Sequence, residues 1–501
     1  MTLKASVPLC DTPICTEDLM ALLHHRLATD LREQISQGVY GAGERLPGVR
    51  ALARTRRVSI ATVLAAYRRL EDDALIEARP RSGYYVRARP TLAVLPPAAS
   101  TPAAQPSPVT GQELVLSLVK GTNVEGLVQL GAAVPDASFL PTRAVERALA
   151  RAARLHRSRA AAYEFPPGLP ELRRQIARRM VQAGCAVGAD EVVITNGCQE
   201  ALVLALQAVT RPGDVVAIES PTFYGLLQVL EALQLEALEI PTDPVDGLSL
   251  EALQLALERW PVKACVATPS FSNPLGYCMP PARKRRLLEL LGRHGVPLIE
   301  DDLYGDLGFG AQRPPPCLSL AAGTGCEVIY CSSFSKTLSP GLRVGWIVPG
   351  RHQARVEYLK YVLNLATPTV SQLAMAELLR GGGYERHLRA VRGDYARAVG
   401  RMIEAVTRHF PPGTRITQPA GGFVIWVELA PHVDSLELAR RARSEGISIA
   451  PGPIFSATQK YRNFVRISCA CPWDGRVEAA LAKVARLAQM EYEHLRIHAG
   501  F

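Results

Sequence analysis

The sequence predicts two folded domains: a small helical domain that ends in a β-hairpin, and a large α/β domain with a mainly parallel sheet and helices on both faces. Three observations predict this organisation. The chain has 501 residues, which is more than one hydrophobic core usually organises. A proline-rich stretch from Pro90 to about Gly111 divides it. Beyond that stretch, short β-branched runs alternate with longer helical patterns.

The composition excludes several classes of protein. Hydrophobic residues make up 48% of the chain, which excludes disorder throughout. No stretch of about 18 uninterrupted apolar residues predicts a membrane span, and no apolar run follows a basic N-terminus, so we expect a cytoplasmic protein. The 11 cysteines and 10 histidines show no ligand spacing, and no metal is predicted.

The formal charge of +10 matters less than its placement, because one stretch near the N-terminus is strongly basic. Seven arginines follow one another there with no acidic residue between them: Arg45, Arg50, Arg54, Arg56, Arg57, Arg68 and Arg69. Such a basic face is typical of nucleic-acid binding, and the alternative is an ordinary solvated surface.

The N-terminal segment predicts three helices. Apolar residues at helical spacing predict the first from Leu19 to Gln37, where Gly38 ends it. Pro47 opens a short second helix through Ala53, Val58 lies in the turn, and Ser59 is the expected N-cap of a third helix, Ile60 to Glu71. Two short helices joined by a tight turn form a helix-turn-helix.

A hairpin is predicted after the third helix. Leu75 to Ala78 and Tyr84 to Arg87 pair around a turn, Arg79 to Gly83, which places two arginines at the tip of a wing. We expect Tyr67 of the third helix to belong to the core. The predicted order is therefore helix, helix, helix, wing.

This segment resembles the GntR-type winged helix. The matching positions are Gly43 to Pro47, Arg50, Leu52, Ala53, Ser59, Thr62, Val63, Ala66, Tyr67, Leu70, Leu75, Ile76, Arg79, Ser82, Gly83 and Val86. The resemblance implies that double-stranded DNA is contacted, mostly at phosphates and at a few base edges, by Arg50, Ser59, Thr62, Arg79 and Ser82. A helical docking module without a DNA role is the alternative.

Six prolines between Pro90 and Pro108 predict a connector without regular helix or sheet, extended and semi-stiff. In the remainder, five short runs predict strands: Val192 to Thr195, Val215 to Ile218, Cys265 to Thr268, Pro297 to Glu300 and Val328 to Cys331. Because longer helical patterns separate them, the predicted sheet is mainly parallel.

Lys336 lies just beyond one of these strands, in a turn with unusual neighbours. Ser333 and Ser335 offer hydroxyls to phosphate oxygens, and Arg343 offers a fixed counter-charge to a dianionic phosphate. A lysine after a strand is otherwise an ordinary surface charge. This combination predicts a pyridoxal-phosphate (PLP) site in which Lys336 forms the Schiff base.

The other groups that PLP needs are present. Asp301 follows a strand and is the candidate partner of the pyridine nitrogen, with Asp302 as the alternative. Asn273, which follows a strand, is predicted to donate to the ring oxygen. The spacing of Asp301 and Tyr304 resembles that of aminotransferases, which implies the same role for Tyr304. Gly197, Cys198 and Gln199 begin a helix whose first amides are expected to hold the phosphate.

The order and spacing of these motifs resemble fold-type I aminotransferases over nearly the whole remainder. The resemblance implies a PLP-dependent transferase fold with a smaller C-terminal α+β subdomain. It further implies that Phe223 stacks on the pyridine ring, that Tyr163 reaches the phosphate of a partner subunit, and that Arg466 grips a substrate carboxylate. Relatives often have Tyr at the position of Phe223, and Ser or Ala at that of Cys198.

The whole chain resembles the MocR subgroup of GntR-type regulators, with a winged helix at 17–89, a linker at 90–112 and an aminotransferase-like domain at 113–495. This implies a homodimeric transcription regulator that binds an operator and senses PLP or an amino acid or other amine. The alternative is a working aminotransferase with an appended DNA-binding domain. Neither a membrane nor a metal partner is expected.

Overall fold

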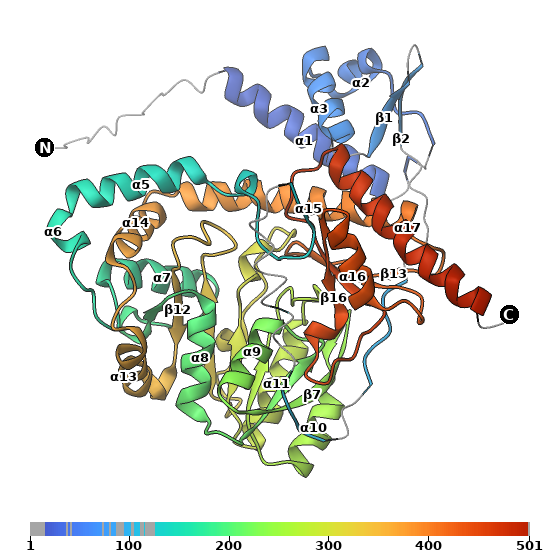
Figure 1. Cartoon of the computed structure of the whole chain (residues 1–501). Coiled ribbons are helices and arrows are strands. Elements are labelled where there is room, and N and C mark those ends of the chain that lie inside the picture. Colours follow the sequence, from blue (N-terminus) through green and yellow to red (C-terminus); the bar gives the residue numbers. More distant parts are fainter. Residues whose placement is uncertain are drawn as a thin grey trace, which may run out of the picture. The chain divides into compact units, whose positions relative to one another are not determined.

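Three helices and a hairpin form the N-terminal unit of the computed structural model, which describes residues 16–36, 39–40, 43–72, 75–79, 82–86, 95–101, 105–110, 115 and 126–498. The chain divides into two units, Met1–Ala93 and Val94–Phe501. The elements of the first are α1 (Thr16–Ser36), α2 (Val49–Arg56), α3 (Ile60–Asp72), β1 (Ile76–Arg79) and β2 (Gly83–Val86), shown in blue in Figure 1. This confirms the predicted order.

Local interactions set the bounds of the two short helices. The Ser59 hydroxyl accepts a hydrogen bond from Thr62 N at 3.0 Å, which confirms Ser59 as the N-cap of α3. The predicted end of α2 at Ala53 is wrong: the helix continues to Arg56, because Arg57 adopts the left-handed conformation and its N–H closes the last turn. Tyr67 is fully buried, as predicted, and its hydroxyl donates to Pro47 O at 2.6 Å.

A nine-stranded sheet is the centre of the second unit. Its strands lie in the order β3 (Ser107–Pro108), β7 (Glu236–Asp243), β6 (Val215–Ser220), β9 (Val262–Ala267), β10 (Leu298–Asp301), β11 (Val328–Ser333), β12 (Gly345–Val348) and β5 (Val193–Thr195), with β8 (Gly247–Leu248) beside β7. The five strands from β7 to β11 pair in parallel, whereas β12 is antiparallel to both its neighbours. The mainly parallel sheet is therefore confirmed.

Helices cover both faces of this sheet because successive strand residues are buried on opposite sides. One face packs against α8 (Cys198–Val209), α9 (Tyr224–Ala232) and α13 (Gln353–Asn364). The opposite face packs against α5 (Thr142–Leu155), α7 (Pro170–Gln182), α10 (Leu250–Arg259), α11 (Pro281–Arg293), α12 (Cys317–Leu320) and α14 (Thr369–Arg380). The short α6 (Arg157–Ala160) follows α5.

A smaller α+β subdomain follows. Its four-stranded antiparallel sheet has the order β13 (Arg415–Ile416), β14 (Val424–Glu428), β17 (Phe464–Ser468) and β16 (Ala450–Pro451). It packs with α15 (Gly383–His409), α16 (Ser435–Ser444) and α17 (Gly475–His498). A short parallel pair, β4 (Val128–Gln129) with β15 (Ile447–Ser448), joins this subdomain to the segment before α5. In Figure 1, α16, α17 and β16 gather in the red part of the chain.

The connector differs from its prediction. Ser107 and Pro108 form β3 and pair with Ala237 and Glu236, so part of the stretch is regular sheet. Proline is tolerated there because β3 is an edge strand, where a missing N–H costs no ladder bond. Upstream, Leu95 O accepts from Ile416 N at 3.0 Å and the Ser100 hydroxyl donates to Ser220 O at 2.8 Å. The described part of the connector is thus attached to the large unit.

Within the described ranges, we find no helix both long and apolar enough to cross a membrane.

Candidate functional site

A cavity of about 180 Å³ lies at the carboxyl ends of β9, β10 and β11, where the loops after parallel strands meet. It is lined by Ala133, Val134, Cys198, Gln199, Leu202, Phe223, Tyr224, Thr268, Asn273, Asp301, Leu303, Tyr304, Ser335, Lys336 and Arg343. Most of the residues predicted for the PLP site are among them. The sequence motifs are far apart along the chain, and the sheet brings them together.

Asp301 and Asp302 have different environments, although they are adjacent. Asp301 lines the cavity and accepts a hydrogen bond from Cys198 Sγ at 3.3 Å. Burial, together with the charge of Asp302, raises the pKa of Asp301 to about 6. Asp302 pairs instead with Arg313 and accepts from the Tyr330 hydroxyl at 2.8 Å. Of the two carboxylates, only Asp301 is therefore available to a group in the cavity.

Among the described residues, Lys336 is the only lysine on the cavity wall, and its Nζ donates to Ala133 O at 2.7 Å. Burial lowers the pKa of this amine to about 8, and the charges of Arg466 and Arg343 act in the same direction. The lowered pKa increases the neutral fraction of this amine near neutral pH relative to an exposed lysine. A neutral amine is the nucleophile that attacks an aldehyde.

Tyr304, Asn273 and Arg466 form a polar group at one side of the cavity. Asn273 bonds to the Tyr304 side chain and accepts from Arg466 Nη1 at 3.1 Å. Arg466 is fully buried, is not part of the cavity wall and also bonds to Gly131 O, while its Nε has no partner within the described part of the chain. One nitrogen of the guanidinium, Nε, is thus buried without a hydrogen-bond partner among the described residues.

The predicted phosphate cradle is assembled from two loops. Arg343 Nη2 donates to Asn196 O at 2.9 Å, beside Gly197. Gly197 has a φ of +82°, and a Cβ at this position would overlap with the Arg343 guanidinium. Ser335 lines the cavity, whereas Ser333 is buried behind it and donates to Val344 O. Ser333 therefore supports Ser335 in this structure and does not face the cavity.

Two aromatic residues occupy contrasting positions. Phe223 lines the cavity next to Gly225, at which any Cβ would overlap with the Phe223 ring. Tyr163 is 69% exposed, stacks on Phe165 and does not line the cavity of its own chain. A role of Tyr163 at this type of site requires a second copy of the chain.

The donor set fits PLP. An amine with a lowered pKa, a buried carboxylate, phenol and amide donors, and a glycine–arginine cradle converge on one cavity. The sequence missed the segment around Gly131 and Ala133, which contacts Arg466 and Lys336 through backbone carbonyls. No motif marks this segment, because backbone atoms make the contacts.

We expect Asp301→Ala to weaken PLP binding by about 10- to 100-fold, the range for a lost charge-assisted hydrogen bond. Asp302→Ala should weaken it less and lower the Tm more, because Arg313 loses one of its two carboxylate partners and the buried Tyr330 hydroxyl loses its acceptor. Equilibrium dialysis and thermal melts of both variants measure this. The reverse ranking for PLP binding would transfer the pyridine role to Asp302.

The predicted DNA-contacting residues differ in their exposure and in their contacts within the domain. Arg50 on α2 is exposed. Arg79 is exposed at the end of β1, where it pairs with Glu77 at 2.8 Å and lies over the Tyr85 ring. Ser82 bonds to the Tyr85 hydroxyl at 2.6 Å. Pro80 and Arg81 of the predicted wing tip lie outside the described residues.

Thr62 requires a correction. It is 3% exposed, and its hydroxyl lies 2.7 Å from Ser59 Oγ. The side chain thus completes the N-terminus of α3 and has almost no surface for a DNA contact.

In the described part of the chain, no group of three or more His, Cys, Asp or Glu residues could hold a metal ion.

Comparison with known families divides the chain in the same way. Residues 23–86 match bacterial regulatory proteins of the gntR family, and residues 127–484 match aminotransferase class I and II. The class I and II aminotransferase fold implies dependence on PLP.

Individual relatives agree with this. The chain is 41% identical over 461 residues to the uncharacterized HTH-type transcriptional regulator YjiR of Escherichia coli strain K12, covering 92% of this chain and 97% of that protein. The chain is also 38% identical over 466 residues to the uncharacterized HTH-type transcriptional regulator YdcR of the same strain. This match covers 93% of this chain and 99% of that protein. The crystal structure of LysN, an α-aminoadipate aminotransferase from Thermus thermophilus, matches with a TM-score of 0.70 and 30% identity, covering 77% of this chain and 96% of that one.

Proposed function

The chain belongs to the HTH-type transcriptional regulators of MocR type, in which a GntR-type DNA-binding domain is fused to an aminotransferase-like domain, and from this premise we propose that it is a PLP-dependent sensor. It would bind an operator through its winged helix and PLP, or PLP with an amino compound, in the cavity at Lys336. The observation that supports this most directly is a complete PLP donor set in one chain with a winged helix. We place this activity in the cytoplasm.

The proposal assigns a task to each side chain of the cavity. PLP, when bound, supplies an aldehyde for the amine of Lys336 and an electron-withdrawing ring. Asp301 would face the pyridine nitrogen, Asn273 and Tyr304 the ring oxygen, and Gly197, Gln199, Ser335 and Arg343 the phosphate. Phe223 would cover one face of the ring. The free Nε of Arg466 offers a donor to the carboxylate of an incoming amino acid.

We propose a homodimer, for which exposed apolar side chains of the large unit are the support. On and beside α13, Tyr358 is 60% exposed, Val362 65% and Leu363 52%, and Tyr163 and Phe165 are exposed as well. A group of large apolar side chains at a surface is typical of a protein contact. A second copy would cover it, and two-fold symmetry suits two DNA half-sites.

The second candidate function is a working aminotransferase. It is favoured by the same residues, because amine binding at Lys336 and carboxylate binding at Arg466 serve turnover and sensing alike. Solved relatives such as LysN are named as aminotransferases. Incubating the PLP-loaded protein with amino acids and a keto-acid acceptor separates the two: sustained turnover supports the enzyme, whereas operator binding without turnover supports the sensor.

The test of the sensor is a binding titration on the DNA that flanks the protein's own gene. We expect sequence-specific binding in competition with unrelated DNA, and a changed affinity when PLP or PLP with an amino acid is added. Specific binding that never responds to either ligand would contradict sensing. Absence of specific binding to this DNA would contradict the presence of an operator there.

We expect Arg50→Ala and Arg79→Ala each to weaken operator binding and to lower the slope of log affinity against log salt by about 1, since each would remove a phosphate contact. PLP absorption should stay unchanged. Arg462→Ala is the control, because Arg462 is an exposed arginine of the large unit that pairs with Asp434. An unchanged salt slope in both variants would remove them from the DNA interface.

A further inference from the structure

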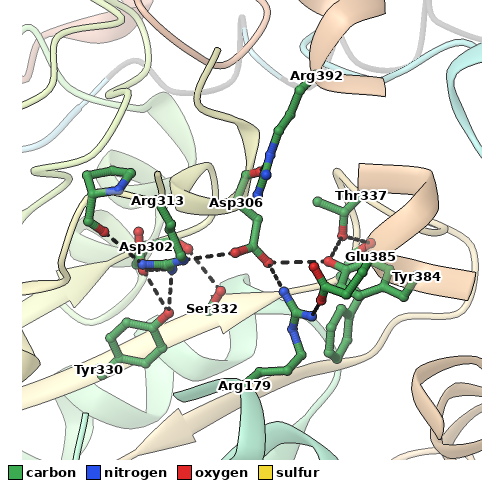
Figure 2. Close-up of polar contacts among 12 residues, drawn as sticks. Arg179, Asp302, Asp306, Arg313, Tyr330, Ser332, Thr337, Tyr384, Glu385 and Arg392 are labelled. Carbon is green, nitrogen blue, oxygen red and sulfur yellow. Dashed lines mark hydrogen bonds and ion pairs between the residues drawn. The ribbon is translucent and has the colours of Figure 1, made fainter. Parts of the chain in front are cut away.

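A series of buried and partly buried polar contacts connects the loop after β10 with the loop after β11 (Figure 2). It begins at Asp302, which pairs with Arg313. Arg313 Nε donates to Asp306 Oδ1 at 2.8 Å, and Arg179 Nη2 donates to Asp306 Oδ2 at 2.8 Å. The Tyr384 hydroxyl lies 3.3 Å from Asp306 Oδ2 and 2.9 Å from Thr337 Oγ1. We call Asp302, Arg313, Asp306, Tyr384 and Thr337 the bridging network.

Both ends of the bridging network are neighbours of cavity residues. Asp302 directly follows Asp301 in the chain, and its backbone oxygen accepts a hydrogen bond from the Ser332 hydroxyl at 2.9 Å. Thr337 directly follows Lys336 in the chain, and Thr337 O lies 2.7 Å from His387 Nε2. The network itself does not line the cavity. The bridging network therefore connects the Asp301 carboxylate and the Lys336 amine through residues outside the cavity wall.

Helix α15 anchors the network. Its first turns supply Tyr384 and His387, and Arg392 Nε donates to Asp306 O at 2.7 Å. One helix thus contacts both loops. The Tyr384 ring also packs against Phe334 at 5.9 Å between centroids, in the Lys336 loop.

The charges of the bridging network favour a fixed arrangement of its side chains. Burial opposes ionisation of Asp306, but Arg179 and Arg313 outweigh it and hold the pKa of this carboxyl well below its usual range. Buried ion pairs add little net stability, because desolvation offsets most of the attraction. Asp302 is paired with Arg313, and its charge still acts with burial to raise the pKa of Asp301, so the position of Asp302 bears on the ionisation of Asp301.

We propose that Arg313, Asp306 and Tyr384 are positioning residues that fix Asp301 and Lys336 relative to each other for PLP binding. This inference rests on the proposed function, because it requires PLP in the cavity. A binding site loses affinity for its ligand when the surrounding residues no longer hold the ligand-contacting side chains in place. The network acts through its neighbours and touches no ligand itself.

The test uses the full chain and two variants. Tyr384→Phe removes one hydroxyl and keeps the ring, and Asp306→Asn keeps the shape and removes the charge. We expect the PLP dissociation constant, from equilibrium dialysis well below the Tm, to rise by about 3- to 10-fold for Tyr384→Phe, the effect of one lost hydrogen bond, and by more for Asp306→Asn. Asp434→Asn is the matched control: Asp434 pairs with Arg462, and neither lines the cavity.

A double-mutant cycle distinguishes positioning from general stability. If Tyr384 acts through Lys336, Tyr384→Phe weakens PLP binding in the wild-type background but has little further effect in Lys336→Ala. Unchanged PLP affinity of Tyr384→Phe and Asp306→Asn, with only a lower Tm, would overturn the inference. An equal effect in both backgrounds would also overturn it. Failure of the wild-type chain to bind PLP would instead contradict the proposed function.

Discussion

We expect Lys336→Ala to abolish the visible absorption of the PLP-loaded protein while the chain still folds. The covalent link to the cofactor requires this amine, and no other lysine of the described ranges lines the cavity. Folding should persist, because the buried amine donates to a backbone oxygen, Ala133 O, and its lowered pKa indicates that burying its charge is unfavourable. Absorption spectra before and after dialysis against PLP, with circular dichroism, measure both effects.

The matched control is another buried lysine. Lys284 is fully buried and donates to Ser270 Oγ at 2.8 Å and Pro315 O at 2.9 Å, outside the cavity wall. Lys284→Met should lower the Tm, because two acceptors lose their donor, yet keep the visible absorption. Absorption that persists in Lys336→Ala would reject the assignment of the Schiff-base lysine.

The second large effect concerns coupling between the cavity and DNA. PLP, or PLP with an amino acid, should change operator affinity by about 5- to 150-fold, the range of typical allosteric coupling. A ligand shifts an equilibrium only if it binds two states unequally, and an amino acid whose carboxylate replaces Gly131 O at Arg466 would provide such a difference. Fluorescence anisotropy on a labelled operator, with apo, PLP-bound and amine-saturated protein, measures it.

We propose the connector as the segment in which to test this coupling, because its described residues contact the large unit. The Ser100 hydroxyl donates to Ser220 O, three residues before Phe223 of the cavity wall, and Leu95 O accepts from Ile416 N of the small subdomain. Ser100→Ala should therefore reduce the ligand-dependent change in operator affinity while PLP absorption stays unchanged. If the three ligand states of the wild-type protein bound the operator equally, the aminotransferase would become the better proposal.

Local patterns in the sequence were sufficient for the elements and the chemistry. Helical spacing with the Ser59 cap predicted α3, β-branched runs predicted five strands of the large sheet, and residue types after strands predicted Asp301, Tyr304 and Lys336 on one cavity wall. These predictions succeeded because caps, periodicity and strand ends depend on neighbours along the chain. For the two adjacent carboxylates the sequence named Asp301 as the candidate and kept Asp302 as the alternative, because what separates them is a contact from another part of the fold, the pairing of Asp302 with Arg313.

Contacts between distant segments were decided by the tertiary structure alone. Arg313 pairs with Asp302 and leaves Asp301 to the cavity, and Arg179 reaches Asp306 across 127 positions of sequence. The burial of Thr62, the attachment of the connector and the Gly131 contact of Arg466 are of the same kind. The sequence determined which groups are available, because residue identity fixes charge and donor type. The packing of the strands and helices determined which groups meet, because a contact depends on where the whole chain places both partners.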